Sequence, residues 1–280
     1  SHRRMREQHI HRLFSAGRSM DEMLAEVYQG VDPRLLPLAR RANLSGIPEL
    51  VQKMRSGGEQ LTGQVVEAMT TNETFFFRDK IPFDHLRDGI LPGLIQSRAN
   101  RRTLRIWSAA CSTGQEPYSI AMCLREYGPA LAGWRIEIVA TDLSQEVLEK
   151  SKAGLYSQFE VQRGLPIQLL VKYFNQLGEL WQLSADIRGM VQHRQLNLLQ
   201  DFSHLGKFDV IFCRNVLIYF DQETKASIFE RLAKVMEPDG TLLLGAAESV
   251  VGITDAFKPN QERRGLYQIN PARSPRGGPD

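Results

Sequence analysis

The sequence lacks any hydrophobic run long enough to cross a membrane. Its longest apolar stretches, such as Val210–Cys213 and Thr241–Ala247, have the length of a strand, whereas a membrane-spanning helix needs about 20 apolar residues. The stretch Ser1–Arg12 is polar and rich in arginine and histidine, which is not the pattern of a signal peptide. Ser1-His2 is typical of an expression scar, so the natural start stays open. We therefore predict a cytoplasmic protein without membrane insertion.

Cysteine is also scarce, with only Cys111, Cys123 and Cys213. The number is odd and the spacings match no zinc-binding pattern. We interpret all three as reduced thiols, as is usual in the cytosol, and we predict no metal site. For Cys111, which falls in a predicted ligand-binding loop, a reactive thiol is the alternative.

A strong excess of charge of one sign is missing as well. The net charge is +3, which gives no indication of a nucleic-acid partner. The 280 residues, 42% of them hydrophobic, suffice for one large domain, or for one domain with a small appendage.

The chain divides into parts with different hydrophobic patterns. Residues 1–75 have a helical and basic pattern, and we predict a small helical domain and linker there. Residues 76–270 form the predicted main domain, in which about 154–196 hold a small antiparallel insertion. The tail 271–280 is rich in proline, glycine and arginine and is predicted to be disordered.

Within the main domain, short apolar runs alternate with helical stretches. Four strands are predicted: Leu104–Ala110, Ile136–Thr141, Phe208–Cys213 and, after a turn at Pro238–Gly240, Thr241–Gly245. Alternating strands and helices favour an α/β fold with a parallel, doubly wound sheet. Ligands of such sheets bind beyond the carboxyl ends of the strands, so the motifs of interest are those that follow the strands.

The first motif is Trp107-Ser-Ala-Ala-Cys-Ser-Thr-Gly-Gln-Glu-Pro-Tyr118, which follows the first strand and opens a helix. Such a turn offers backbone N–H groups to a ligand. With Gly114 as its one glycine it is not a dinucleotide fingerprint, and a nucleoside with an amino-acid tail is the alternative ligand. Glu116 could accept a hydrogen bond from an ammonium group, or could simply be a carboxylate that the helix dipole favours.

Two further motifs follow the second and third strands. Asp142 could accept hydrogen bonds from ribose hydroxyls, or it could cap the next helix in competition with Ser144. The segment Cys213-Arg-Asn-Val-Leu-Ile-Tyr-Phe-Asp221 brings Asn215 and Tyr219 toward the predicted cleft. Tyr219 could equally be a core residue whose hydroxyl is satisfied.

The fourth motif, Thr70-Thr-Asn-Glu-Thr-Phe-Phe-Phe-Arg-Asp79, lies where the two predicted domains meet. Its three phenylalanines fit a hydrophobic latch between domains. Asn72, Thr74 and Arg78 are polar residues at a hinge, where ligand contacts gather.

In this order, together with Asn197-Leu-Leu199, these segments resemble the CheR family of chemotaxis receptor glutamate methyltransferases. The likeness extends from about residue 60 to 268. It implies the fold of S-adenosylmethionine-dependent methyltransferases, with S-adenosylmethionine as cofactor and S-adenosylhomocysteine as product. It also implies the residues that contact the cofactor: Asn72, Thr74, Arg78, Glu116, Asp142, Asn197, Leu198, Asn215 and Val216.

The resemblance further implies the reaction, in which a glutamate carboxylate attacks the methyl group. A carboxylate is already ionised at neutral pH, so no strong general base is needed. We expect Arg78 to fix a carboxylate, most plausibly that of the cofactor, and Tyr219 to orient the acceptor glutamate. The partner that the resemblance implies is the cytoplasmic domain of methyl-accepting chemotaxis receptors. The basic residues predicted to dock on it are Arg34, Arg40, Arg41, Lys53 and Arg55.

Alternatives remain at this point. A methyltransferase for another acceptor is one, although an amine-methylating enzyme would be expected to show Asn/Asp-Pro-Pro-aromatic where this chain has Arg-Asn-Val-Leu-Ile-Tyr. A non-catalytic sensor of S-adenosylmethionine is another. Some family members grip a C-terminal receptor peptide with a glycine-rich loop in the insertion. The stretch Tyr173–Trp181 has a single glycine, and we expect no dependence on such a tether.

Overall fold

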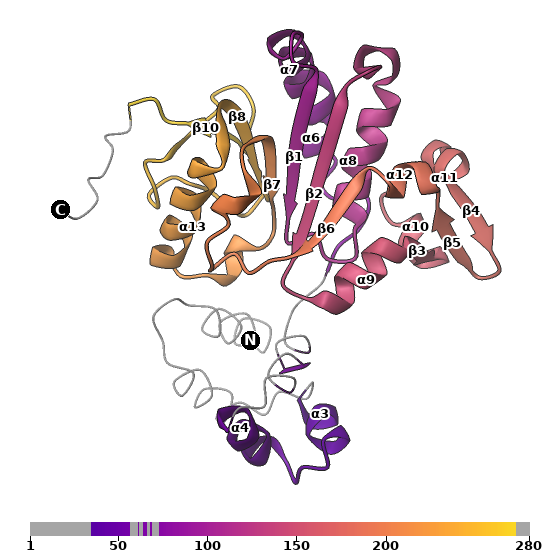
Figure 1. The fold of residues 1–280 in the computed structure, drawn as a ribbon, viewed down its shortest axis with the longest axis vertical. Helices are drawn as coiled ribbons and strands as arrows, with labels where there is room; N and C mark the ends of the chain where they lie inside the picture. The colour runs from indigo at the N-terminus through magenta and orange to yellow at the C-terminus, as the bar shows by residue number, and fades with distance from the viewer. Residues whose placement is uncertain (1–34, 57–60, 62–63, 66–67, 69–72, 273–280) are drawn as a thin grey trace.

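The computed structural model describes residues 35–56, 61, 64–65, 68 and 73–272 (Figure 1). The described part contains a seven-stranded sheet with strand order β6-β2-β1-β7-β8-β10-β9 and a three-stranded sheet with order β3-β5-β4. The strands of the large sheet are β1 (Thr103–Ala109), β2 (Arg135–Asp142), β6 (Val191–Gln195), β7 (Phe208–Cys213), β8 (Met236–Leu244), β9 (Phe257–Pro259) and β10 (Leu266–Ile269). The first five strands of that order are parallel to one another. Strand β10 pairs antiparallel with both β8 and β9.

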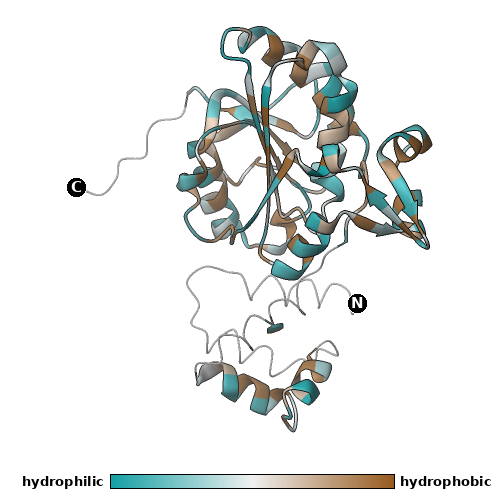
Figure 2. Ribbon diagram, turned by 45° about the vertical axis from the view of Figure 1, so that its right-hand side comes forward, coloured by the Kyte–Doolittle hydropathy of each residue, from teal (hydrophilic) through white to brown (hydrophobic). Residues whose placement is uncertain are grey.

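Helices cover both faces of the large sheet, because successive strand residues point to opposite sides. Ile106 and Ile138 pack in one core with α8, whereas Trp107 and Val139 pack in a second core with α13. Figure 2 shows the hydrophobic residues along the central strands, between these layers. The helices of the main domain are α6 (Ile81–His85), η1 (Leu86–Ile90), α7 (Leu91–Ser97), α8 (Gln115–Glu126), η2 (Gly128–Leu131), α9 (Gln145–Ala153), η3 (Ser203–Leu205), η4 (Leu217–Tyr219) and α13 (Gln222–Lys234). The predicted doubly wound fold is confirmed.

The predicted turn at Pro238–Gly240 is wrong. These residues belong to β8, where the register with β7 jumps from the Phe208–Met236 pair to the Val210–Thr241 pair. Residues 237–240 therefore bulge opposite a single residue, Asp209. The bulge is held because Arg98 bonds both Asp209 and Asp239, a contact between distant segments that local sequence does not indicate.

The small sheet is the expected antiparallel insertion. It consists of β3 (Leu155–Ser157), β4 (Phe174–Leu177) and β5 (Leu180–Leu183), with α10 (Gln158–Gln162), α11 (Ile167–Tyr173) and α12 (Ala185–Arg188) nearby in sequence. The expected bound at 196 is too late, because β6 pairs with β2 and belongs to the large sheet. The insertion lies at one side of the molecule, beside α8 and α9 (Figure 1).

The described amino-terminal part consists of α3 (Leu36–Arg41) and α4 (Ile47–Arg55). It has a core of its own, to which Leu35, Leu50 and Val65 contribute. Arg34, Asn72 and the tail 273–280 lie outside the described residues. No helix in the described ranges is long and apolar enough to span a membrane.

Candidate cofactor and acceptor site

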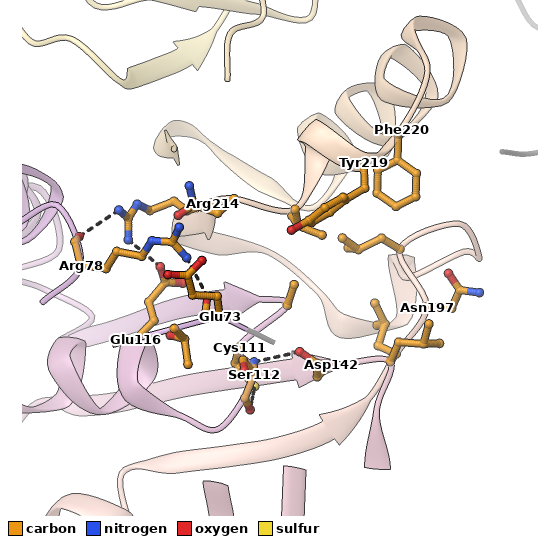
Figure 3. A pocket seen from close by; sticks show the side chains of 17 residues that line it. Glu73, Arg78, Cys111, Ser112, Glu116, Asp142, Asn197, Arg214, Tyr219 and Phe220 are labelled. Atoms are coloured by element: carbon orange, nitrogen blue, oxygen red, sulfur yellow. Dashed lines mark hydrogen bonds and ion pairs between the residues drawn. The ribbon is translucent and has the colours of Figure 1, made fainter. Parts of the chain in front are cut away.

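A cavity opens at the carboxyl ends of β1, β2, β6 and β7 (Figure 3), where ligands of parallel sheets are expected. It contains about 1000 Å³ of space, including the part open to solvent. The predicted site residues in its lining are Thr74, Arg78, Glu116, Asp142, Asn197, Leu198, Asn215, Val216 and Tyr219. Asn72 lies outside the described part of the chain, so its predicted role stays a prediction.

The turn after β1 needs its glycine. Gly114 has a φ of +95°, and a Cβ on it would lie 2.1 Å from the Ser151 Oγ atom. Ala110 and Ser112 are also left-handed, with φ of 57° and 51°, and this backbone shapes the floor of the cavity. Burial raises the pKa of the Cys111 thiol, which argues against the alternative of a reactive thiolate there.

Asp142 is fixed at the end of β2 by backbone donors. Its carboxylate accepts hydrogen bonds from Ser112 N at 2.8 Å and Ser144 N at 3.0 Å. The side chain of Ser144 caps α9 by accepting from Val147 N, so the capping role belongs to Ser144. Asp142 also lines the cavity, and a carboxylate there is a suitable acceptor for ribose hydroxyls.

Glu116 lies in the first turn of α8 and belongs to a buried ionic network. It accepts hydrogen bonds from Ser108 Oγ and from Arg214 Nη1, both at 2.8 Å. The Arg214 side chain is only 1% exposed and also donates to Asp79 and to the Arg78 carbonyl. The sequence reasoning missed Arg214. A cation directly after a fully buried strand was the signal that could have revealed it, because such a charge needs partners.

Arg78 is placed differently from Arg214. It is half-buried, donates to the Glu73 carbonyl at 2.7 Å and lies over the Phe75 ring at 5.6 Å. Among the described residues it forms no ion pair, so its guanidinium retains donors for an anion in the cavity.

Two of the three phenylalanines of this segment pack on aromatic rings of the main domain, whereas Phe75 lies against the guanidinium groups of Arg78 and Arg163. Phe76 is fully buried against the rings of Tyr156 and Phe174 in the insertion, at 5.0 and 5.6 Å. Phe77 packs on Phe83 of α6. The latch therefore joins the insertion and α6 to the hinge segment.

The remaining lining follows β6 and β7. Asn197 accepts from Leu199 N at 2.9 Å, and Asn215 is left-handed with a φ of 59°. Figure 3 shows Arg78 and Glu116 at one end of the cavity, Asp142 near the middle and Asn197 at the other end. The Tyr219 ring lies across the cavity from Asp142, with its hydroxyl directed toward the interior.

A family model described as "CheR methyltransferase, SAM binding domain" matches residues 72–266 of this chain. The chain belongs to the CheR methyltransferase family. It is 43% identical to Chemotaxis protein methyltransferase 1 of Pseudomonas aeruginosa, over 84% of this chain and 87% of that protein. It is 41% identical to Chemotaxis protein methyltransferase 1 of Vibrio cholerae, over 81% of this chain and 83% of that protein. PKMT2 from Rickettsia typhi in complex with AdoHcy aligns with 51% of this chain and 20% of that one, at 20% identity and a TM-score of 0.33.

As a CheR domain, the chain has S-adenosylmethionine as its cofactor. The polar groups of the cavity suit that molecule, since the Arg78 cation and the Glu116 carboxylate lie at one end and the Asp142 carboxylate lies near the middle. Within the described ranges no group of three or more histidine, cysteine, aspartate or glutamate residues could hold a metal ion.

Proposed function

We propose that this CheR protein transfers a methyl group from S-adenosylmethionine to glutamate side-chain carboxylates of bacterial chemoreceptors, which leaves glutamate methyl esters. Chemotaxis methyltransferases at about 40% identity support the chemotaxis part. The acceptor is supported by the lining, in which no histidine or lysine occurs among the described residues. Glu116 and Asp142 are already engaged by Arg214 and by backbone N–H groups, so the site fits an acceptor that needs no deprotonation.

The proposed cofactor pose follows the order of side chains along the cavity. Arg78 binds the amino-acid carboxylate through a charge-assisted pair, and Glu116 accepts from the ammonium group. Asp142 accepts from the ribose hydroxyls, and Asn197 with Leu198 contacts the base. Thr74, Asn215 and Val216 complete the contacts, as does Asn72 of the segment outside the described residues.

The bound cofactor supplies a methyl group on a positively charged sulfur. A glutamate oxygen forms the new bond to the methyl carbon while the carbon–sulfur bond breaks and its electron pair stays on sulfur. No proton moves, because the carboxylate is ionised at neutral pH. The protein aligns the three atoms and removes water from the acceptor. Tyr219 orients the acceptor through its hydroxyl, which points into the cavity.

The receptor is proposed to dock on the amino-terminal helices. Arg40 and Arg41 occupy the last turn of α3, and both are exposed, as is Lys53 of α4. Their hydrophobic neighbours are turned into a separate core, so the basic side chains face solvent. An acidic receptor surface in the cytoplasm is the partner that complements them.

A C-terminal receptor tether is proposed to be unnecessary. Only Gly178 and Glu179 separate β4 from β5, with Gly178 at a φ of 61°, and a turn this tight has little backbone to enclose a peptide. Calorimetry with the C-terminal pentapeptide of the receptor should show no binding. A micromolar dissociation constant, on the order of −8 kcal/mol, would overturn this part.

The test of the reaction uses radiolabelled S-adenosylmethionine and a receptor cytoplasmic fragment. We expect label on the receptor that mild base releases as methanol, because esters are base-labile and methylamines are not. A receptor fragment with its acceptor glutamates changed to glutamine is the matched control. Base-stable label would indicate another acceptor, and cofactor binding without transfer to any fragment would favour a sensor.

A further inference from the structure

Glu248 lies outside the cavity lining, in the segment after β8, yet it is tied to a wall of the cavity. One of its oxygens, Oε2, accepts from Asn215 N at 2.8 Å and Gly245 N at 2.7 Å. The other oxygen, Oε1, accepts from the next three backbone N–H groups, at 3.0 Å from Val216, 2.8 Å from Leu217 and 3.3 Å from Ile218. One carboxylate thus receives four consecutive N–H groups of the turn that follows β7.

That turn is strained and would be costly without an anion. Asn215 has a left-handed φ of 59° and Val216 a φ of −122° with ψ of −38°. This conformation directs successive N–H groups to one side, which makes a concave anion-binding surface. Backbone donors that lose their partner carry a desolvation cost. Glu248 therefore supplies, from 30 to 33 residues away, what keeps this turn in place.

The segment after β8 and the turn after β7 are also in close contact at Gly245. A Cβ on Gly245 would lie 2.7 Å from Asn215 Nδ2 and 2.8 Å from Glu248 Oε2. Only glycine allows this approach, because a larger residue would push the turn away from the carboxylate. Burial raises the pKa of Glu248, while the backbone N–H donors oppose that shift.

The turn held by Glu248 contains residues of the proposed site. Asn215 and Val216 line the cavity, and η4, which follows them, ends at Tyr219. A shift of the turn would move the proposed cofactor contacts and the proposed acceptor-orienting hydroxyl together. Misplacement of reacting groups by about 1 Å can cost on the order of a hundredfold in rate.

We propose that Glu248 is a positioning residue for methyl transfer, which holds the 215–218 turn so that Asn215, Val216 and Tyr219 face the bound cofactor and acceptor. The inference rests on the proposed function for the identity of the acceptor. The effect of Glu248 on affinity for the cofactor does not depend on which acceptor is methylated.

The test compares Glu248→Gln with wild type. Glutamine has the same size but only one acceptor oxygen, so its amide N–H₂ must face backbone donors. We expect roughly a ten- to hundredfold loss of affinity for S-adenosylhomocysteine by calorimetry. In the methyl-transfer assay kcat should fall, whereas KM for the receptor should stay, since docking uses α3 and α4. Glu248→Asp, which keeps the charge but is shorter, should lie between the two.

Two further variants make the outcome decisive. Glu137→Gln removes a carboxylate that pairs with Arg105 near the amino end of β1, away from the cavity, and should leave affinity and kcat unchanged. Gly245→Ala should reproduce the Glu248→Gln pattern by displacing the turn. Wild-type affinity and kcat in Glu248→Gln, or an equal loss of affinity in Glu248→Gln and Glu137→Gln, would overturn the proposal. If wild type binds the product but methylates no receptor fragment, the proposed function fails while the affinity comparison still tests Glu248.

Discussion

At the scale of single residues, Asp142 links the fold to the proposed recognition of the cofactor. Its carboxylate is positioned by Ser112 N and Ser144 N, so the acceptor geometry exists before any ligand arrives. Preorganisation of this kind lowers the ordering cost of binding.

The first prediction follows from that geometry. Asp142→Ala should lose two ribose hydrogen bonds worth about 0.5–1.5 kcal/mol each, which corresponds to roughly a five- to hundredfold loss of affinity. Titration calorimetry with S-adenosylhomocysteine measures it. Ser144→Ala is the matched control, because it removes the cap of α9, at a cost of about 1 kcal/mol in stability, and leaves the carboxylate. Equal affinity in Asp142→Ala and wild type would remove the ribose assignment.

Tyr219 gives a second prediction at this scale. Tyr219→Phe keeps the ring but removes the hydroxyl that points into the cavity. Turnover with the receptor fragment should fall about tenfold or more, since an oriented hydrogen bond to a charged acceptor is lost, while affinity for S-adenosylhomocysteine stays. A variant that turns over like wild type would make Tyr219 a packing residue.

Local motifs indicated Asp142, which directly follows a predicted strand, and Glu116, which opens the helix after another. The residues that the sequence did not indicate are held by distant partners. Arg214 and Glu248 matter because of partners 98 and about 30 residues away. Such pairings depend on how the sheet assembles, which no window of the sequence contains.

At the scale of elements, the same division holds. The predicted strand Phe208–Cys213 matches β7, because its hydrophobic run is a local signal. The β8 bulge and the pairing of β6 with β2 were not foreseen. Proline and glycine at 238–240 normally indicate a turn, and here tertiary bonds from Arg98 override that preference.

The insertion also supports the 110–114 turn that follows β1. Tyr156 of β3 is buried and donates its hydroxyl to the Thr113 carbonyl at 2.8 Å. Gly164 lets the segment after α10 lie against Phe76, because a Cβ there would lie 2.1 Å from the Phe76 carbonyl oxygen. The insertion thus contacts the 110–114 turn and the 73–78 segment, and other residues of both line the cavity.

We therefore predict that Tyr156→Phe weakens cofactor binding although Tyr156 does not line the cavity. One lost hydrogen bond to this partly buried carbonyl is worth about 1 kcal/mol, or roughly fivefold in affinity. Tyr173→Phe is the matched control in the same insertion, since its hydroxyl bonds Glu126 instead. If both variants bind S-adenosylhomocysteine equally well, the insertion does not support the turn.

The contact between α9 and β6 should give stability a dependence on pH. Burial, together with the nearby charge of Lys152 and against that of Glu149, lowers the pKa of His193 from 6.5 to about 4. The Nε2 atom of His193 lies 2.6 Å from Ser151 Oγ. The unfolded chain then binds a proton that the folded chain does not, so stability is lost as pH falls from 6.5 toward 4. Urea unfolding at several pH values should show a flatter profile in His193→Gln. An unchanged profile would mean that His193 does not carry this dependence.

At the scale of the whole molecule, the proposed function assigns receptor recognition and methyl transfer to different parts of the chain. The exposed Arg40, Arg41 and Lys53 belong to α3 and α4, which have their own core, whereas the cavity belongs to the large sheet. Docking should therefore be separable from catalysis by mutation.

Charge reversal at Arg40 and Arg41 tests this separation. The double Glu variant should raise KM for the receptor about tenfold at low salt, with less effect at high salt because ions screen exposed charges. Its affinity for S-adenosylhomocysteine should not change. The double variant Lys234→Glu and Lys258→Glu, with both exposed lysines on α13 and β9, controls for net charge. If the two double variants have the same KM, docking does not use α3.

The hydrogen bond from Tyr156 to the Thr113 carbonyl should also affect the rate at which the backbone of the small sheet unfolds locally. A ligand that reduces the motion of the 110–114 turn should also slow local unfolding of β3. It should slow local unfolding of β5 as well, because β5 is hydrogen-bonded to β3. Deuterium uptake by those amides would then fall when the cavity fills, although no ligand atom reaches them. Deuterium uptake by the small sheet, measured by mass spectrometry, would therefore report whether the cavity is occupied, without any label on the ligand.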